Sequence, residues 1–364
     1  MRIGVPRETT AGERRVALVP ESVARLVKAG VEIVVERGLG TQANLPDELY
    51  EKAGATFGDP WPANVVVKVQ KPSADEARKL AKGAILISLL PTSTSADLLS
   101  QLGGAGVSAL SLERVPRITR AQSMDILSSQ ATIAGYKAVL IGAEEMGKIL
   151  PMLTTAAGNI PPAKAFVLGA GVAGLMAIST ARRLGAVVSG FDIRAAAREQ
   201  VLSLGATFVG PEPSADAEAA GGYARAQTED EQRKTMDAMA AHLKDQDLVV
   251  TTAQIPGRAA PRLITAAMVA SMKPGAVIVD LAAETGGNCE LTTAGQTTVH
   301  NGVSIIGALN LPSSVPFHAS LMFSKNVLTL LQHLIKDGNI TLNLDDEITG
   351  PMCVTHNGET RPLK

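Results

Sequence analysis

The chain has 364 residues, of which 46% are hydrophobic and 19% charged, and its formal net charge is −1 at pH 7. This length predicts two or three domains with large cores, and the near-zero charge, without a stripe of Lys and Arg interleaved with aromatic residues, argues against a nucleic-acid-binding protein. No apolar run reaches the roughly 18 residues that a membrane span needs, and the N-terminus has no signal-peptide pattern, so we expect no direct membrane insertion. Cys289 and Cys353 lack the spacing of metal ligands, so we expect no metal site.

Residues 1–127 alternate between short apolar runs and amphipathic segments, the pattern of a β-α-β-α unit. The expected strands are 2–5, 31–35, 65–69, 84–89 and 106–111, and the expected helices are 20–30, 46–54, 73–82 and 96–102. Strands that alternate with helices form mostly parallel sheets. We therefore predict a first α/β domain here.

Two long helices connect this domain with a second one. A polar, arginine-bearing loop leads into the first helix, whose apolar residues recur at 133, 136, 140, 143, 146 and 150 and which Pro151 ends. The second helix, 318–338, has a similar period and is expected to return the chain to the first domain. We predict an α/β fold of two Rossmann-like, doubly wound parallel-sheet domains linked by long helices, with the domains at 1–127 plus 318–364 and at 128–317.

After the second helix, residues 341–344 and the turn at Asn357-Gly358 predict a short strand or hairpin. In the second domain, further strands are expected at 207–209, 248–252, 277–281 and 304–306. Ala253, directly after one of these strands, is expected to contact a cofactor.

A dinucleotide-binding fingerprint opens the second domain, in the order strand, glycine turn, helix, strand. Gly169 allows the tight turn, Gly171 lets the backbone approach a pyrophosphate, and Gly174 lets the helix pack closely on the strand. Asp192 lies 18 residues after Gly174, where a carboxylate accepts hydrogen bonds from the ribose of NAD and repels a 2′-phosphate. We therefore expect NAD(H) as the cofactor, held by a turn made of Gly169, Gly171, Val172, Ala173 and Gly174.

The segment 212–234 is long, acidic and nearly free of large apolar residues. A polar loop of this length inside a compact domain is functional or a solvated insertion. The functional interpretation is a mobile lid in which Gly221-Gly222 forms a hinge and Tyr223 meets the ligand.

Several motifs together resemble the superfamily of alanine dehydrogenases and proton-translocating transhydrogenases. The motifs are RIGVPRE, GERRVALVPE, VVKVQKP, GAGVAG, MKPGAVIVDLAAETGGN and NLPSSVP. Two others, PRITRAQSMDILSSQATIAGY and AGGYARA, are similar to the transhydrogenase branch. That resemblance implies an alpha-subunit component that binds NAD(H), while a separate NADP(H)-binding component and a separate membrane-spanning component complete the enzyme.

The chain departs from the alanine dehydrogenase branch where that branch binds its substrate. Gln70 stands at the position of a lysine, with Lys71 displaced by one, although a one-residue shift of the alignment would restore Lys71. Pro91 replaces a histidine, and the acid of the VD-x-A-x-D motif corresponds to Glu284. Oxidation of an amino acid needs a base near the operating pH, whereas hydride transfer between two nicotinamides moves no proton at either carbon. The missing groups therefore favour a transhydrogenase.

The resemblance also implies the residues that hold the nicotinamide and its ribose, namely Arg117, Gln122, Asp125 and Ser128. Gln122 would reach toward a second nicotinamide, and Tyr223 with Gly222 would close over the cofactor. Arg194 would lie near the adenosine end, where it reduces the selectivity of Asp192 for NAD over NADP. A purely structural alternative is that Arg117 pairs with Asp125 and that Ser128 or Ser129 caps the next helix.

The resemblance implies a function in which the chain binds NAD(H) and transfers a hydride to NADP+ on the partner, coupled to proton translocation. It implies a cytoplasmic homodimer, peripheral on the inner face of the membrane through its partner chains. Two alternatives remain, an NAD-dependent amino-acid dehydrogenase of the alanine type and a non-catalytic NAD-binding module.

Overall fold

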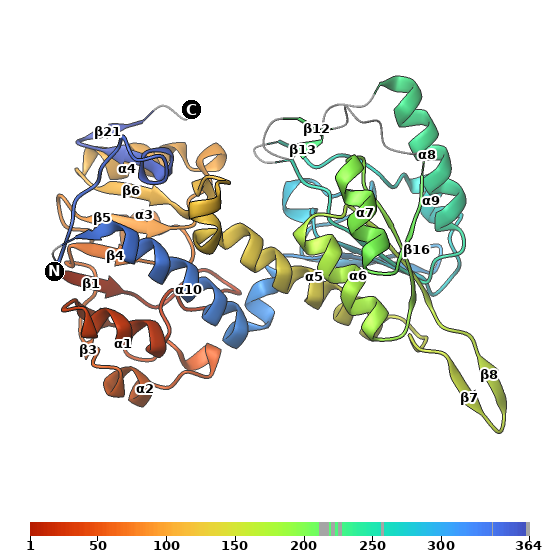
Figure 1. The fold of residues 1–364 in the computed structure, drawn as a ribbon, viewed down its shortest axis with the longest axis horizontal. Helices are drawn as coiled ribbons and strands as arrows, with labels where there is room; N and C mark the ends of the chain where they lie inside the picture. The colour runs from red at the N-terminus through yellow and green to blue at the C-terminus, as the bar shows by residue number, and fades with distance from the viewer. Residues whose placement is uncertain (211–217, 220–222, 225–227, 256–257, 337, 362–364) are drawn as a thin grey trace. The chain divides into compact units, whose positions relative to one another are not determined.

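The computed structural model describes residues 1–210, 218–219, 223–224, 228–255, 258–336 and 338–361. The chain forms two compact units, and each is an α/β structure around its own sheet (Figure 1). Unit 1 comprises residues 1–130 and 312–364, and unit 2 comprises residues 131–311. The predicted α/β class with two parallel-dominated sheets is confirmed.

Unit 1 contains an eight-stranded sheet in the order β21-β20-β6-β5-β4-β1-β2-β3. The strands are β1 (Arg2–Val5), β2 (Glu32–Val35), β3 (Thr56–Phe57), β4 (Val65–Val67), β5 (Ile85–Ser88), β6 (Ser108–Ser111), β20 (Cys353–His356) and β21 (Glu359–Thr360). Pairing is parallel from β3 to β6, while β20 runs antiparallel to both of its neighbours. Because β20 and β21 come from the C-terminus, the end of the chain completes the sheet that the N-terminus begins.

Helices cover both faces of this sheet. They are α1 (Pro20–Lys28), α2 (Asp47–Lys52), α3 (Ala74–Ala77), α4 (Ala96–Gly104), α10 (Pro316–Leu334) and α11 (Thr349–Met352). Val65 and Val67 pack in one core with residues of α1 and α10, whereas Val66 packs in another with residues of α4. A strand that is buried on both faces reads as a continuous apolar run, which explains the unbroken valines of β4.

Unit 2 contains a seven-stranded sheet in the order β11-β10-β9-β14-β15-β17-β16. The strands are β9 (Lys164–Leu168), β10 (Val187–Phe191), β11 (Thr207–Phe208), β14 (Leu248–Thr251), β15 (Val277–Asp280), β16 (Thr297–His300) and β17 (Val303–Gly307). The covering helices are α6 (Val172–Arg183), α7 (Ala195–Ser203), α8 (Glu229–Leu243) and α9 (Ala266–Ala270). The chain leaves β9 for β10 on one side and later returns to β14 on the other. This reversal is the switch point at which open α/β sheets bind ligands, beyond the carboxyl ends of the strands.

Some elements differ from the sequence-based expectations. The long helix α5 (Ile126–Glu145) ends before Gly147 rather than at Pro151, because glycine weakens a helix. The expected helix 73–82 is only α3, since the amides of Lys79 and Leu80 bond to carbonyls three residues back. Helix α8 begins within the segment 212–234, where three acidic residues at 229–231 favour the positive end of a helix dipole.

Three hairpins complete the chain. The turn at Asn357-Gly358 joins β20 to β21, with φ of 50° and 88° at its two residues, so this prediction is confirmed. Residues 341–344 form no strand, and the pair β18 (Ile335–Lys336) and β19 (Asn339–Ile340) precedes them instead. The third hairpin, β7 (Leu153–Thr155) with β8 (Gly158–Ile160), projects away from the sheet of unit 2 (Figure 1) and was not predicted from the sequence.

Candidate functional site

The glycine turn between β9 and α6 is held by contacts that leave no room for side chains at two positions. Gly169 has a φ of +93°, donates its N–H to the carbonyl of Phe191 at 2.8 Å, and accepts from Thr252 Oγ1 at 3.0 Å. A Cβ atom on Gly174 would lie 1.8 Å from the Gly169 carbonyl oxygen. These two glycines are therefore required by the turn and by the close packing of α6 on it.

Gly171 has a different role, since a Cβ atom there would meet no described atom within 4 Å. It precedes the first turn of α6, and Val172 beside it is 44% exposed. The amides of a helix N-terminus carry partial positive charge and bind anions. An open space in front of this backbone, at the switch point of the sheet, fits the pyrophosphate of a dinucleotide.

Asp192 lies directly beyond β10 with a carboxylate that is almost buried. Its Oδ2 accepts the N–H of Ala170 at 2.8 Å, which ties the acid to the glycine turn. Its Oδ1 accepts the N–H of Arg194 at 2.9 Å, and the Arg194 guanidinium binds both oxygens, with Nε at 3.0 Å and Nη2 at 2.8 Å. The structure therefore brings the predicted residues Gly169, Gly174, Asp192 and Arg194 into one site.

Ala253 is positioned by Asn288, a residue that was not predicted from the sequence. The buried Asn288 side chain accepts the N–H of Ala253 at 3.0 Å and donates to the carbonyls of Ala253 and Pro261, both at 2.8 Å. The loops that follow β14 and β15 are thereby joined beside the glycine turn. The asparagine ends the motif VIVDLAAETGGN, so its position directly after a strand and two glycines was the available signal.

Asp280, at the end of β15, stabilises the same region. It is fully buried and accepts four hydrogen bonds, from the side chains of Thr251 and Thr292 and from the amides of Ala282 and Cys289. A buried carboxylate that is fully hydrogen-bonded keeps its charge without a counterion and orders the chain around it. Asp280 thus supports the loops of the site from below.

The predicted nicotinamide loop belongs to unit 1. Arg117 and Gln122 are exposed, and Gln122 lies in the short 3-10 helix η4 (Thr119–Met124) that precedes α5. The Asp125 carboxylate accepts the N–H of Ser128 at 2.9 Å and its hydroxyl at 2.6 Å. Asp125 therefore caps α5, and the alternative of Ser129 as the cap is wrong, because its hydroxyl donates to the carbonyl of Ile126.

The predicted lid lies partly outside the described residues, and this applies to Gly221 and Gly222. Tyr223 begins the short strand β13 (Tyr223–Ala224), which pairs antiparallel with β12 (Glu218–Ala219). The described part of the lid is thus a small hairpin followed by α8.

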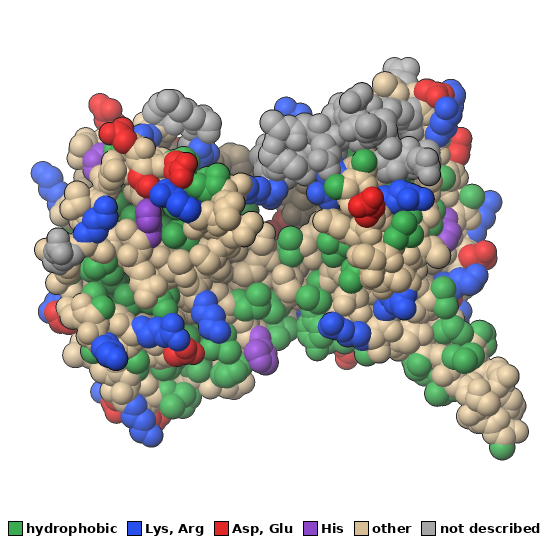
Figure 2. Space-filling view, in the orientation of Figure 1, with side chains coloured by type: hydrophobic (Ala, Val, Ile, Leu, Met, Phe, Trp, Pro, Cys, Tyr) green, Lys and Arg blue, Asp and Glu red, His purple; other side chains and the backbone are tan. Residues whose placement is uncertain are grey.

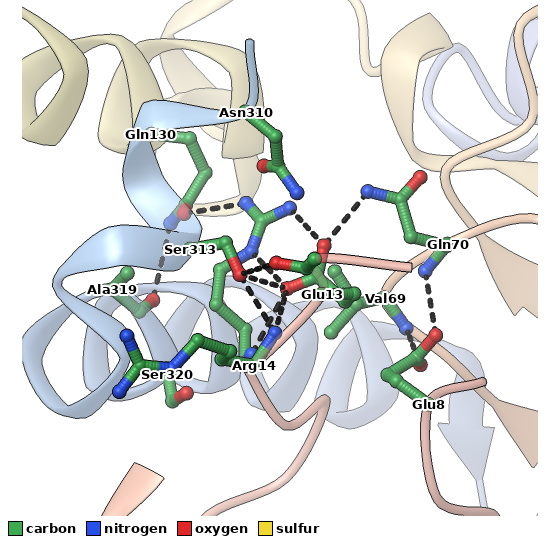
Figure 3. A network of polar contacts seen from close by, with 12 residues as sticks. Glu8, Glu13, Arg14, Val69, Gln70, Gln130, Asn310, Ser313, Ala319 and Ser320 are labelled. Atoms are coloured by element: carbon green, nitrogen blue, oxygen red, sulfur yellow. Dashed lines mark hydrogen bonds and ion pairs between the residues drawn. The ribbon is translucent and has the colours of Figure 1, made fainter. Parts of the chain in front are cut away.

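In unit 1, Gln70 and Lys71 occupy different surroundings, which distinguishes the two alignments of the KVQKP motif. Gln70 Nε2 donates to Glu13 Oε2 at 2.8 Å, whereas Lys71 Nζ lies 3.3 Å from Ser95 Oγ. Figure 3 shows that Gln70 points toward Glu13, which also contacts the Ser313 hydroxyl. Gln70, not Lys71, is therefore the side chain that joins this network.

The network is built on a buried ion pair. Glu13 binds the guanidinium of Arg15, with Nη2 and Oε2 at 2.7 Å, and Arg15 Nη1 donates to Gln130 Oε1 at 2.9 Å. Burial by itself would raise the pKa of Glu13, but the hydrogen bonds and charge of Arg15 outweigh it and lower the pKa to about 2. The arginine is thus neutralised by its own chain.

A second buried charge cluster surrounds Lys68, on the same motif. Lys68 Nζ lies 3.2 Å from Glu76 and 3.5 Å from Glu8, and all three side chains are nearly inaccessible. Burial raises the pKa of Glu8 to about 7, although the charge of Lys68 and the amide of Val69 lower it. One lysine is therefore shared by two carboxylates, of which Glu8 is the weaker acid.

The described residues lack two kinds of feature. No described helix combines the length and the apolarity that are needed to cross a membrane. No group of three or more His, Cys, Asp and Glu among these residues could hold a metal ion.

Comparisons with known proteins agree with this site. Family models described as "Alanine dehydrogenase/PNT, N-terminal domain" and "Alanine dehydrogenase/PNT, C-terminal domain" match residues 4–134 and 138–362. The first of the polypeptides that make up the NAD(P) transhydrogenase alpha subunit of Rhodospirillum rubrum is 46% identical, over 98% of this chain and 97% of the relative. The crystal structure of transhydrogenase from Sinorhizobium meliloti is similar with a TM-score of 0.91 and 45% identity, covering 99% of this chain and 100% of that one.

Similarity to the other branch is weaker. The alanine dehydrogenase of Bacillus subtilis is 30% identical, over 98% of this chain and 92% of the relative. The difference in identity agrees with the departures at Gln70 and Pro91. These matches confirm the resemblance predicted from the motifs, and the chain belongs to the alanine dehydrogenase/PNT family.

Proposed function

We propose that this chain is the NAD(H)-binding component of a proton-translocating transhydrogenase, which transfers a hydride to NADP+ held by a partner component. The observation that carries the proposal is the open glycine turn at the switch point of unit 2, with Asp192 hydrogen-bonded to it. The likeness to transhydrogenase subunits over the whole chain supports the same function.

The residues of unit 2 would hold the adenosine half of the cofactor. The amides around Gly171 would bind the pyrophosphate, and Asp192 would accept hydrogen bonds from the adenosine ribose. Ala253, fixed by Asn288, would line the same cleft at the end of β14. These are binding and orienting tasks, which need rigid backbone more than reactive side chains.

In unit 1, Arg117, Gln122, Asp125 and Ser128 would hold the nicotinamide and its ribose. Asp125 and Ser128 already form a hydrogen-bonded pair at the start of α5 that offers further acceptor and donor positions to ribose hydroxyls. Gln122 is exposed on η4 and can reach a ligand without rearrangement of the backbone. Tyr223 and Gly222, on the loop of unit 2, would close over the cofactor.

The nicotinamide of NADH supplies the hydride when it is bound, so the chain itself needs to move no proton at a reacting carbon. This requirement agrees with Gln70 and Pro91 at the positions of two proton-transfer or substrate-binding groups. It also agrees with Arg15, whose guanidinium is engaged by Glu13 and is therefore not offered to a substrate carboxylate.

A hydride-transfer assay tests the proposal. The chain is mixed with an NADP(H)-binding partner, and transfer from NADH to an NADP+ analogue is followed. Gln122→Asn should slow transfer at least tenfold and weaken NADH binding much less, because the shortened side chain no longer reaches the second nicotinamide. Ser123→Ala, at an exposed neighbour on the same 3-10 helix, is the matched control and should behave as the wild type.

Two results would contradict the proposal. Transfer that is absent in the wild-type mixture would favour a non-catalytic NAD-binding module, and equal losses of transfer and binding in Gln122→Asn would move Gln122 away from the second ring. Production of NADH from alanine and NAD+ by the chain alone would favour the amino-acid dehydrogenase.

The complete complex would contain the NADP(H)-binding and membrane-spanning components, with this chain peripheral on the cytoplasmic face. A homodimer would use the β7–β8 hairpin together with the long helices. All six strand residues of the hairpin are exposed, Met152 at its base is 64% exposed, and the segment 149–163 carries no charged residue (Figure 2). An isolated two-stranded hairpin is marginal in water, so contact with a second copy would stabilise it.

A further inference from the structure

The carboxylate of Asp192 is already saturated by hydrogen bonds from its own chain. Each of its two oxygens accepts one backbone N–H, from Ala170 at 2.8 Å and from Arg194 at 2.9 Å. Each also accepts one bond from the Arg194 guanidinium, at 2.8 and 3.0 Å. A carboxylate offers about four acceptor positions, so a ribose hydroxyl can bind only where one of these donors leaves.

The two backbone donors cannot leave without unfolding the site. Ala170 lies within the glycine turn, and the Arg194 amide lies directly before α7. The guanidinium is different, because it belongs to a long flexible side chain that is 25% exposed, against 8% for the carboxylate. Arg194 therefore covers the side of Asp192 that faces the open end of the site.

We propose that Arg194 is a specificity-determining residue that competes with the ribose for Asp192. The inference rests on the proposed NAD(H) site and adds to it that the guanidinium must move aside when the adenosine ribose binds. The displaced guanidinium stays within reach of the ribose 2′ position. With NADP(H) it would pair with the 2′-phosphate, which Asp192 alone would repel.

Arg194 thus acts in opposite directions on the two dinucleotides. It weakens NAD(H) binding, because an ion pair must be broken, and it strengthens NADP(H) binding, because it offsets the charge of the acid. Arg194→Ala should bind NADH about threefold more tightly, since a partly exposed ion pair is no longer lost on binding. The same variant should bind NADPH about tenfold more weakly, since a charge-assisted hydrogen bond to phosphate is lost.

The experiment measures dissociation constants for NADH and NADPH on the full chain by titration calorimetry, with the wild type, Arg194→Ala and Arg194→Lys. Lysine keeps the positive charge but not the bidentate geometry, so its NADPH affinity should lie between the other two. Arg183→Ala, which removes an exposed arginine from the last turn of α6, is the matched control and should leave both constants unchanged. Melting temperatures show that each variant is folded.

A ratio of NADPH to NADH dissociation constants that rises at least tenfold in Arg194→Ala supports the proposal. Equal weakening of both dinucleotides in a folded Arg194→Ala would overturn it and make the arginine a general binding residue. If Arg194→Ala is unfolded, the lysine variant decides, because an unchanged ratio there overturns the proposal. Absence of NADH binding in the wild type would instead contradict the proposed function, so the two failures are distinguishable.

Discussion

The substitutions Gly174→Ala and Gly171→Ala test whether the glycine turn contains two different kinds of glycine. A methyl group on Gly174 would lie 1.8 Å from the carbonyl oxygen of Gly169 and 2.8 Å from its carbon. Ordinary contacts between heavy atoms are roughly 3.5–4.0 Å, so backbone has to move. Because the obstacle is main chain, we expect Gly174→Ala to lower the free energy of unfolding by about 1–3 kcal/mol or more.

Gly171→Ala should behave differently. The added methyl meets no described atom within 4 Å, and the φ of −76° suits alanine. The cost at a helix N-cap is less than about 1 kcal/mol. The methyl would, however, stand in the space through which a pyrophosphate approaches the helix amides. We expect the dissociation constant for NADH to rise about tenfold, equal to the loss of one charge-assisted hydrogen bond.

Urea denaturation followed by circular dichroism measures stability, and quenching of NADH fluorescence measures binding. The informative outcome is the separation of the two effects, with stability lost in Gly174→Ala and affinity lost in Gly171→Ala at nearly normal stability. The reasoning is refuted if Gly174→Ala is as stable as the wild type, or if Gly171→Ala binds NADH with an unchanged dissociation constant.

Two further predictions concern a buried acid and an exposed hairpin. The pKa of Glu8 is about 7 in the folded chain against 4.5 for the free side chain, so the folded chain binds more protons between these values and its stability falls as pH rises. Glu8→Gln should remove at most about 3 kcal/mol of this decline between pH 4.5 and 7 in urea denaturation, and an equal decline in both proteins would contradict the cause. Charging the hairpin with Leu153→Lys and Ile160→Lys should reduce the mass measured by light scattering from dimer to monomer. Val299→Lys, at an exposed apolar residue of β16, should not, and a dimer that survives the hairpin substitutions would exclude this interface.

Local chemistry made much of the fold predictable. The apolar run of β4, the turn at Asn357-Gly358 and the strand, turn and helix around Gly169 each depend on neighbours in the sequence. Errors occurred where local signals were weak. The highly charged start of α8 resembled a loop, and the β7–β8 hairpin has no strong alternation to identify it.

Site residues divide in the same way. The spacing from Gly174 to Asp192 indicated a ribose-binding acid, and the absence of a histidine at Pro91 indicated hydride transfer without a base. The partners of these residues could not be read from the sequence. Asn288 binds Ala253 across 35 residues, and Gln70 binds Glu13 across 57.

By itself, the sequence determined an NAD-type fingerprint, two α/β domains and the branch of the family to which the motifs are similar. Only the tertiary structure decided which strands are neighbours, and hence that β9 lies between β10 and β14 with the glycine turn at the switch point. It also decided that Asp192 is covered by Arg194 and that Lys68 is shared by Glu8 and Glu76. The physical reason is that conformational preferences act over a few residues, whereas hydrogen bonds and ion pairs depend on distances that folding sets between remote parts of the chain.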